Sequence, residues 1–433
     1  MLVLDTNSHG ACNVLEKPTK QRVWLLFVLI VAIVVAFLDR SNVSVLIAND
    51  AFLKEMGISG QPVKIGMIMS AFLFAYGFSN IILSPIGDYL GPRKTMMISI
   101  ILWSISLFVA GLTSTFLMMI VMRIALGVGE GLQYPQQSVF IKKWFPPKER
   151  GLANAMPNIA QSLSLAMSMA IFAWIVSAYG WRMCFFSCSV MSVIPLIMLY
   201  FLSTDTPRQN KKVNKLELKY IEDALEEEAK QGNCDDLGTV WENLKLSIYN
   251  YRYWLVVIYH SCMNMILWGL VTWMPSYLKS QLGFTWAEMG ALSSLPFVLA
   301  CITKFISGWL SDRVGRRAPF GVVSMLATAI CIYLSAHVVN HYAAAILLII
   351  GLAISSLGTP TNWTLLQTFA SGRAISSAAG LMNGIGFFFT ALAPLAIGFF
   401  IGITGGYSGG LLFLVCMAMI AFVASLILAL QKY

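Results

Sequence analysis

The feature that most constrains this chain is an apolar run of about 20 residues that recurs along its whole length. An α-helix rises about 1.5 Å per residue, so a run of about 20 residues spans the ~30 Å hydrocarbon core of a bilayer. Twelve such runs can be placed, and only 11% of the 433 residues are charged, whereas soluble domains carry about a quarter. A water-soluble fold is therefore excluded. We predict an all-α membrane protein of twelve transmembrane helices.

The predicted helices fall into two halves of six. They cover residues 23–47, 63–87, 95–112, 116–140, 151–176 and 182–202, and then 254–278, 287–310, 319–336, 342–369, 374–403 and 410–430. The long polar stretch 203–252 has Glu and Lys at helical spacing in 215–231, which predicts a surface helix. We interpret the chain as two six-helix bundles, 23–202 and 253–430, joined by a cytoplasmic linker with an amphipathic helix, with tails at 1–22 and 431–433.

Basic residues gather where a membrane topology would place them. With the N-terminus inside and alternating helices, the cytoplasmic segments hold 22 of the 29 Lys and Arg residues, and the external segments hold 4. The positive-inside rule then predicts that both termini are cytoplasmic. The net charge of +9 follows from this topology, so we expect a lipid bilayer and no nucleic-acid partner. Short predicted tails and the lack of targeting signals favour the inner (plasma) membrane of a bacterium.

Motifs of enzymes and metal sites are missing from the sequence. It contains neither Gly-x-Ser-x-Gly nor His-Glu-x-x-His, and its eight Cys residues include no Cys-x-x-Cys pair. We therefore expect no enzyme activity, no metal and no organic cofactor.

Charged side chains inside predicted spans indicate ion and substrate pathways, because such residues cost several kcal/mol each in a bilayer. Arg123 and Glu130 lie seven residues apart, which places both on one face of their helix. We hypothesise that the acids carry a proton and that the arginines hold a substrate carboxylate. The alternative is that Asp39 with Arg123, or Arg40 with Glu130, form permanent ion pairs that join predicted helices 1 and 4. We disfavour it because buried pairs stabilise proteins weakly. The charged residues are Asp39, Arg40, Arg123, Glu130 and Lys304.

Lys304 and His260 have simpler explanations. Lys304 lies two turns before Asp312, so its side chain can extend to the cytoplasmic face. His260 could carry a proton, but a hydrogen-bonded role in helix packing is favoured because no carboxylate lies nearby on its own helix.

The second half carries neutral polar residues and indoles in its spans and, apart from Glu288 at the start of one span, no acid or Arg. We predict that these side chains contact the hydroxyl groups and carbon frame of the ligand, with hydrogen bonding between helices as the alternative for each. The candidates are Asn264, Trp268, Thr361, Asn362, Trp363 and Asn383.

Two similar loops follow helices 2 and 8. One contains Asp88 and Arg93, and the other contains Asp312, Arg313 and Arg316. A repeat of this kind is how many transporters are built, and an Asp facing Arg at a helix end can form a latch on one side of the membrane. We predict that these five residues form cytoplasmic gate loops.

The loops resemble the G-x-L-x-D-R-x-G-R-R signature of the major facilitator superfamily. The second copy, Gly308 to Arg317, matches every fixed position, whereas the first has Ser84 and Tyr89 in place of Gly and Arg. More specific resemblance lies in LDRSN at 38–42, RIALGVGEG at 123–131 and WFPPKER at 144–150, which are similar to the anion:cation symporter branch. That branch includes bacterial galactonate, glucarate and hexuronate transporters and the vesicular glutamate and sialic acid carriers of animals.

The resemblance implies a monomeric symporter that imports a small organic anion with protons. It implies a sugar acid (an aldonate, aldarate or hexuronate) as substrate, protons as the coupling ion, Asp39 and Glu130 as proton carriers, and Tyr76 and Gln161 as further ligands beside Arg40 and Arg123. Two alternatives stay open: an antiporter or exporter of the same fold, for instance of organic phosphates, and a nutrient sensor that does not transport. A sensor would be expected to carry an output domain, for which the predicted tails leave no room.

Overall fold

The computed structural model describes residues 18–83, 86–232, 245, 247–369 and 375–432. Within them, twelve helical spans are long and apolar enough to cross a membrane, which confirms the predicted number. The first half contains α1 (Gln21–Leu46), α3 (Pro62–Ile82), α5 (Pro92–Leu112), α6 with α7 (Phe116–Gly131 and Gln133–Trp144), α8 (Pro147–Tyr179) and α9 (Arg182–Leu202). The second half contains α12 (Tyr251–Ser276) with η2 (Tyr277–Gln281), α13 (Trp286–Val314), α14 (Ala318–His337), α15 with α16 (His341–Ser355 and Gly358–Phe369), α17 with α18 (Ile375–Thr390 and Leu392–Thr404) and α19 (Tyr407–Leu430).

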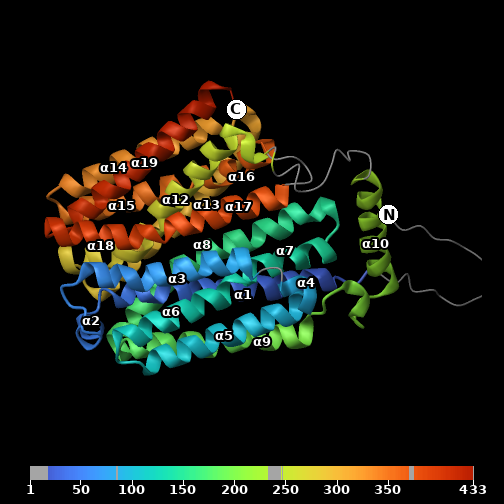
Figure 1. Cartoon of the computed structure of the whole chain (residues 1–433), viewed down its shortest axis with the longest axis horizontal. Helices are drawn as coiled ribbons and strands as arrows, with labels where there is room; N and C mark the ends of the chain where they lie inside the picture. Colours follow the sequence, from blue (N-terminus) through green and yellow to red (C-terminus); the bar gives the residue numbers. More distant parts are fainter. Residues whose placement is uncertain (1–17, 84–85, 233–244, 246, 370–374, 433) are drawn as a thin grey trace, which may run out of the picture.

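The two halves form two bundles that lie against each other, with the first half below the second in Figure 1. The helix α10 (Lys215–Gly232) covers the stretch for which a surface helix is predicted, and it lies outside both bundles at one end, which we call the linker end. The opposite end, where α2 (Asp50–Glu55) lies, we call the far end. Two other short helices, α4 (Ile86–Leu90) and η1 (Pro207–Gln209), lie in the connections.

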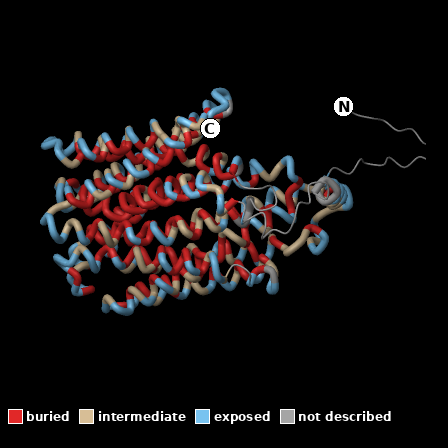
Figure 2. The backbone as a smooth tube through the Cα atoms, turned by 45° about the horizontal axis from the view of Figure 1, so that its top comes forward, coloured by how far each residue is buried: buried red, intermediate tan, exposed pale blue. Residues whose placement is uncertain are grey.

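Buried residues fill the interior of the bundles, and the helix faces that point outward are exposed (Figure 2). Large apolar side chains are among those exposed, such as Phe201 and Phe305, which expose 69% and 77% of their surface. An apolar exterior of this extent is unfavourable in water and suits contact with lipid tails.

Three of the helices predicted from the sequence are interrupted in the structure, and the interruptions were not predicted. The predicted spans 116–140, 342–369 and 374–403 break at Leu132, at residues 356–357 and at Ala391. A proline is the third residue of the helix that follows each break: Pro135, Pro360 and Pro394. Proline has no backbone N–H, so it is tolerated in the first turn of a helix and disfavoured inside one. The predicted span 63–87 also ends early, because α3 stops at Ile82.

The break between α6 and α7 leaves carbonyl groups that neighbouring helices satisfy. Pro135 cannot donate to the carbonyl of Gly131, and the side-chain amide of Asn80 donates to that oxygen instead, at 3.3 Å. The hydroxyls of Ser79 and Ser99 donate to the carbonyls of residues 128 and 129, at 2.8 and 2.6 Å. A broken helix inside a membrane protein is stable only when such partners are present.

The two halves press against each other at the far end. A Cβ at Gly66 on α3 would lie 2.3 Å from the carbonyl oxygen of Pro394 on α18. On the other side of the molecule, a Cβ at Gly290 on α13 would lie 2.9 Å from the Cβ of Ala173 on α8. Glycine is required where helices approach this closely, so these contacts seal the two halves together at the far end.

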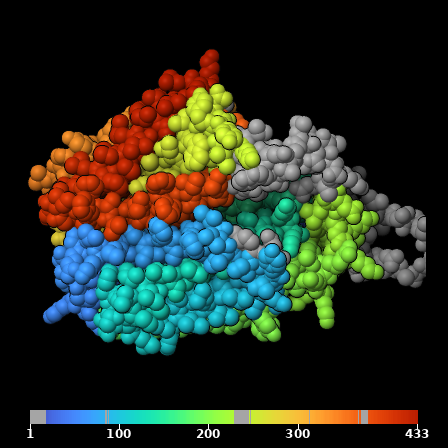
Figure 3. Space-filling view, viewed as in Figure 1, coloured from blue at the N-terminus to red at the C-terminus, as the bar shows by residue number. Residues whose placement is uncertain are grey.

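The contact between the halves is looser toward the linker end. α3 and α17 still touch where Ile81 meets Gly384. Further along, Cβ atoms at Gly151, Gly308 and Gly380 would meet no atom within 4 Å in the described chain. The surface is hollowed between the two halves toward this end (Figure 3).

The linker helix α10 is fastened to the first half by a buried acid. Glu217, whose surface is fully buried, accepts hydrogen bonds from the backbone N–H groups of Gln21 and Arg22 at the start of α1, at 3.0 and 3.3 Å. Its carboxylate also pairs with the Arg22 guanidinium at 2.9 Å. A negative charge at a helix N-terminus satisfies unpaired N–H groups and the helix dipole together.

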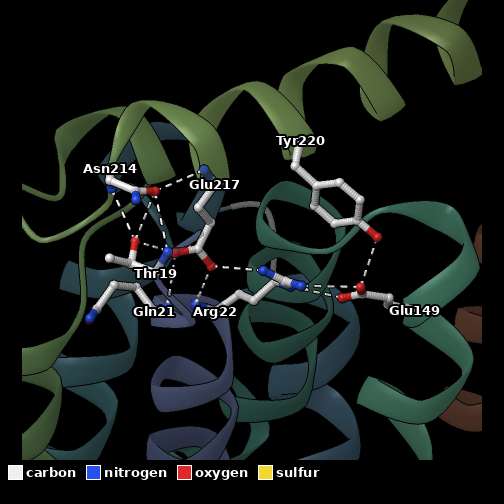
Figure 4. A network of polar contacts seen from close by, with 7 residues as sticks. All are labelled: Thr19, Gln21, Arg22, Glu149, Asn214, Glu217 and Tyr220. Carbon is white, nitrogen blue, oxygen red and sulfur yellow. Dashed lines mark hydrogen bonds and ion pairs between the residues drawn. The ribbon is translucent and has the colours of Figure 1, made fainter. Parts of the chain in front are cut away.

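The same arginine extends this network to α8. Arg22 donates to both carboxylate oxygens of Glu149, at 2.8 and 3.2 Å, and the hydroxyl of Tyr220 donates to Glu149 at 2.9 Å. The start of α1, the start of α8 and α10 are therefore held together. Figure 4 shows the full set: Thr19, Gln21, Arg22, Glu149, Asn214, Glu217 and Tyr220.

Candidate functional site

Four charged side chains of the first half lie inside its bundle. Asp39 and Arg40 are on α1, Arg123 and Glu130 are on α6, and none of them exposes more than 1% of its surface. Burying ionisable groups is costly unless they are paired or hydrogen-bonded. Their individual contacts therefore decide what each group can do.

Arg40 and Glu130 form an ion pair. The Nε of Arg40 donates to Oε2 of Glu130 at 2.5 Å. The guanidinium packs against the rings of Phe37 and Tyr76, 4.3 and 4.4 Å from their centroids. Both Nη atoms of Arg40 and Oε1 of Glu130 are buried and have no hydrogen-bond partner among the described residues. A guanidinium binds a carboxylate through parallel N–H groups, so these Nη atoms suit an anion.

Two glycines one turn apart bring α6 close to α3. A Cβ at Gly127 would lie 2.5 Å from the carbonyl oxygen of Phe72, and one at Gly131 would lie 2.7 Å from that of Tyr76. A larger residue at either position would force the two helices apart. The packing therefore fixes the position of Glu130, which directly precedes Gly131.

Asp39 and Arg123 are placed differently from the other two charges. One oxygen of Asp39 accepts a hydrogen bond from the Ser192 hydroxyl at 3.3 Å. Arg123 donates from Nε to the carbonyl of Ile68 at 3.4 Å, and its guanidinium lies 4.7 Å from the centroid of the Phe72 ring. Within the part of the chain that is described, no ion pair joins Asp39 to Arg123. Of the two ion pairs that the sequence allowed, the one between Arg40 and Glu130 is formed.

A cavity of about 170 Å³ lies between the two halves, and Arg40 forms part of its wall. Both bundles contribute to it, as expected for a ligand site between repeats. Seven of the residues that the sequence analysis proposed as substrate ligands line it: Arg40, Tyr76, Gln161, Asn264, Trp268, Trp363 and Asn383.

Three other proposed ligands do not line this cavity. Arg123 lies behind it, with the contacts given above. Thr361 and Asn362 line a much smaller hollow beside Tyr259 instead. Thr359 and Trp363, four residues apart on the same helix α16, line the main cavity, so Thr361 and Asn362 lie on another face of that helix.

His260 is hydrogen-bonded within the second half, the role favoured from sequence, and it also lines the cavity. Its ring nitrogens lie 3.1 Å from the side-chain amide of Asn264 and 3.0 Å from that of Asn362. The ring of Trp363 packs edge-on against it at 5.5 Å. Asn362 therefore does not line the cavity itself, but its hydrogen bond helps to hold the His260 ring in the cavity wall.

Lys304 does not extend to the end of the bundle as predicted. Its Nζ donates to the hydroxyl of Ser162 on α8 at 2.9 Å, and its side chain lines the cavity. The reason is the length of α13, which continues for ten residues to Val314, or about 15 Å of helix. That distance exceeds the reach of a lysine side chain.

Among the described residues, the arginines of the predicted gate loops make no contact with the opposite half. Arg93 donates to the carbonyls of Leu199 and Tyr200 at the end of α9, in its own half. Arg313 lies 3.8 Å from the Trp309 ring centroid on its own helix, and Arg316 is exposed. The side chains of Asp88 and Asp312 lie outside the described residues.

Several residues of the cavity are not among those predicted from the sequence. Tyr134 lies four residues after Glu130, a helical spacing that could have identified it, and its hydroxyl donates to Gln161 at 3.0 Å. The others have no signal in the sequence, because their positions depend on how helices of both halves pack together. They include Phe37, Asn158, Ser162, Met263, Ser355, Ser356, Thr359 and Phe387. No cluster of His, Cys, Asp and Glu that could hold a metal occurs among the described residues.

Comparison with known proteins identifies relatives along the whole chain. The family described as Major Facilitator Superfamily matches residues 29–394 and 287–432. A probable sulfoacetate transporter of Cupriavidus necator is 27% identical over an alignment of 405 positions that covers 91% of this chain and 90% of that protein. A probable galactarate/D-glucarate transporter of Escherichia coli K12 is 27% identical over an alignment of 448 positions, gaps included, that covers 96% of this chain and 95% of that protein. The D-galactonate transporter of Escherichia coli O6:H1 is 25% identical over 432 residues, with 95% and 96% covered.

Solved structures share the fold at lower sequence identity. A bacterial homologue of the human lysosomal transporter Spinster, in an inward-facing and unoccupied conformation, superposes with a TM-score of 0.77 at 15% identity, covering 94% of this chain and 98% of that one. A D-xylose-proton symporter gives a TM-score of 0.72 at 14% identity, with 94% and 97% covered. These likenesses concern the fold.

Proposed function

Because the chain belongs to the major facilitator superfamily, we propose that it is a proton-coupled symporter that imports a small organic anion by alternating access. The substrate class we propose is a sugar acid: an aldonate, an aldarate or a hexuronate. The observation that carries the proposal is the buried pair of Arg40 and Glu130 at the wall of a cavity between the two halves. The names of the relatives, which include galactarate/D-glucarate and D-galactonate transporters, point to the same class.

The pair couples the proton to the anion through competition for one guanidinium. While Glu130 is ionised, it neutralises Arg40, and a second carboxylate gains little from binding there. A proton on Glu130 removes that charge and leaves Arg40 as a buried cation without an ionised partner. A substrate carboxylate then restores the balance, so proton and anion favour each other's binding. Asp39, buried on the same helix next to Arg40, is the second proton carrier in this scheme.

The second half recognises the uncharged part of the substrate. Asn264 and Asn383 present amides to the cavity, and Trp268 and Trp363 present indole rings. Amides can bond sugar hydroxyls as donors or acceptors, and aromatic faces pack against the C–H groups of a carbon chain. Gln161 adds an amide from the first half.

We place the linker end in the cytoplasm of a bacterial cell, with both termini inside, because the basic loops gather at this end. The far end then faces the outside, and the contacts of Gly66 with Pro394 and of Gly290 with Ala173 close it. In this orientation the structure represents an inward-facing state.

The test is uptake by proteoliposomes that contain the purified protein, with an imposed inward proton gradient and labelled sugar acids, sulfonates and organic phosphates. Accumulation of an acid that collapses when a protonophore is added supports symport. Exchange that ignores the gradient would favour an antiporter. Binding without flux would favour a sensor.

A further inference from the structure

Lys304 is a cation in the cavity that the symport scheme above does not use. It comes from α13 in the second half. Among the described residues that this half contributes to the cavity wall, Lys304 alone has a charged side chain, with His260 counted as neutral. Its Nζ has one described hydrogen bond, to the neutral hydroxyl of Ser162. Among the described residues, no carboxylate lies within ion-pair distance of it.

A lysine in a membrane interior is costly unless it has an anionic partner or reaches water. One hydroxyl group does not neutralise the charge. An anionic ligand in the cavity would supply the missing counter-charge, and Lys304 would then contribute binding energy when the site is filled.

The charges of the two halves set the charge of the ligand. In the first half, Arg40 lines the cavity and Arg123 does not, and protonation of Glu130 leaves Arg40 with one positive charge to neutralise. In the second half, Lys304 adds one more. A ligand with a single charge, bound at Arg40, would leave Lys304 without a partner. A ligand with an acid group at each end neutralises both.

We propose that the substrate is a compact dianion with two terminal acid groups, one bound by Arg40 and the other by Lys304. This inference rests on the proposed function and narrows it from organic anions in general to the aldarate type of acid. The cavity of about 170 Å³ suits a short chain, since sites for drug-sized ligands hold about 300–1,000 Å³. Because the two cations belong to different halves, a dianion joins the halves when it binds, and a monoanion does not.

The test compares matched acids of equal chain length that differ in one terminal acid group: glucarate with gluconate, and tartrate with threonate. Binding to the purified wild-type protein is measured by calorimetry, and uptake is measured in proteoliposomes. We expect the diacid of at least one pair to bind at least about tenfold more tightly than its monoacid, the order of one desolvated charge pair. Equal affinities within both pairs, or preference for a monoacid, would overturn the proposal.

Variants of Lys304 locate the second acid group. We expect K304Q to remove the preference for the diacid by weakening the binding of the diacid alone. We expect K304R to keep most of the preference. S162A removes the hydrogen bond that Lys304 makes among the described residues but leaves its charge, so it should keep the preference. K64Q changes an exposed lysine at the start of α3 and serves as the matched control.

Failure of this inference is distinct from failure of the proposed function. An equal loss of affinity for the diacid and the monoacid in K304Q would show that Lys304 has a structural role and would overturn the inference. The proposal of symport would stand. If K304Q does not fold, the wild-type comparison and K304R still decide. If no organic anion of any kind is moved by the wild type, the proposed function fails and the dianion with it.

Discussion

Arg40 takes part in both steps of the proposed coupling: it pairs with the proton carrier Glu130, and it binds the substrate anion. Its Nε is occupied by Glu130, while its Nη atoms are unpaired among the described residues and the group lines the cavity. Buried pairs add little to stability, but breaking one leaves an uncompensated charge. A proton on Glu130 would leave the Arg40 guanidinium without a counter-charge, so the binding of an anion there becomes more favourable.

Replacing Glu130 by Gln should uncouple transport from the proton gradient. The amide keeps the shape of the side chain but holds no negative charge, so Arg40 stays available to the substrate whatever the pH. We expect proteoliposomes with E130Q to lose gradient-driven accumulation and to keep exchange of labelled for unlabelled substrate. Accumulation at the wild-type level would show that Glu130 is not the coupling group.

Arg40 and Arg123 should differ in their effect on affinity. Arg40 lines the cavity, whereas Arg123 lies behind it and donates to the carbonyl of Ile68. We expect Arg40→Ala to weaken substrate binding by about 2 kcal/mol or more, the cost of losing one partner of a buried charge pair, and Arg123→Ala to weaken it less. Calorimetric titration of both variants measures the difference. Normal affinity of Arg40→Ala would remove Arg40 from the site.

Among the elements, α10 is set apart from the bundles yet firmly attached to one of them. Glu217 and Glu149 hold it through Arg22 to the starts of α1 and α8, which both belong to the first half. The described network contains no residue of the second half. The linker helix should therefore move with the first bundle when the two halves rock.

Glu217→Gln should loosen α10. The amide cannot neutralise Arg22 and accepts more weakly from the N–H groups at the start of α1, so we expect the free energy of local opening to fall by about 2 kcal/mol. Hydrogen exchange of residues 215–227 measures it. Glu222 offers a matched control, because its pair with Arg208 is exposed, and Glu222→Gln should change exchange by less than about 0.5 kcal/mol. Equal exchange in the two variants would contradict the anchoring role.

At the scale of the whole molecule, the structure is closed at the far end and hollowed at the linker end. The closure depends on contacts between bundles, such as Ala173 with Gly290. Alternating access requires these contacts to open in the other state.

A cross-link at the far end should stop transport. Cysteines at positions 173 and 290 would have Cβ atoms close enough for a disulfide after a small adjustment of the helices. We expect the double variant, A173C with G290C, to lose uptake on oxidation and to regain it on reduction. Oxidation should not change the uptake of either single variant, although the side chain of G290C crowds Ala173 and should lower uptake under both conditions. Undiminished uptake by the oxidised, cross-linked protein would show that the far end does not need to open.

The sequence by itself determined the number of spans and the family, because apolar length and local motifs are properties of consecutive residues. It also singled out Asp39, Arg40, Arg123 and Glu130, because a charge in an apolar run stands out without any knowledge of packing. The match to the major facilitator superfamily confirms the resemblance read from the loops after helices 2 and 8.

Only the tertiary structure decided which of these residues share a cavity. It paired Arg40 with Glu130, placed Arg123 behind the wall and turned Lys304 inward instead of toward the end of the bundle. Spacing along one helix says which residues share a face, but not which face of which neighbour it meets. That choice depends on close approaches such as the one at Gly127, and on breaks such as the one at Leu132, which redirect side chains between helices distant in sequence.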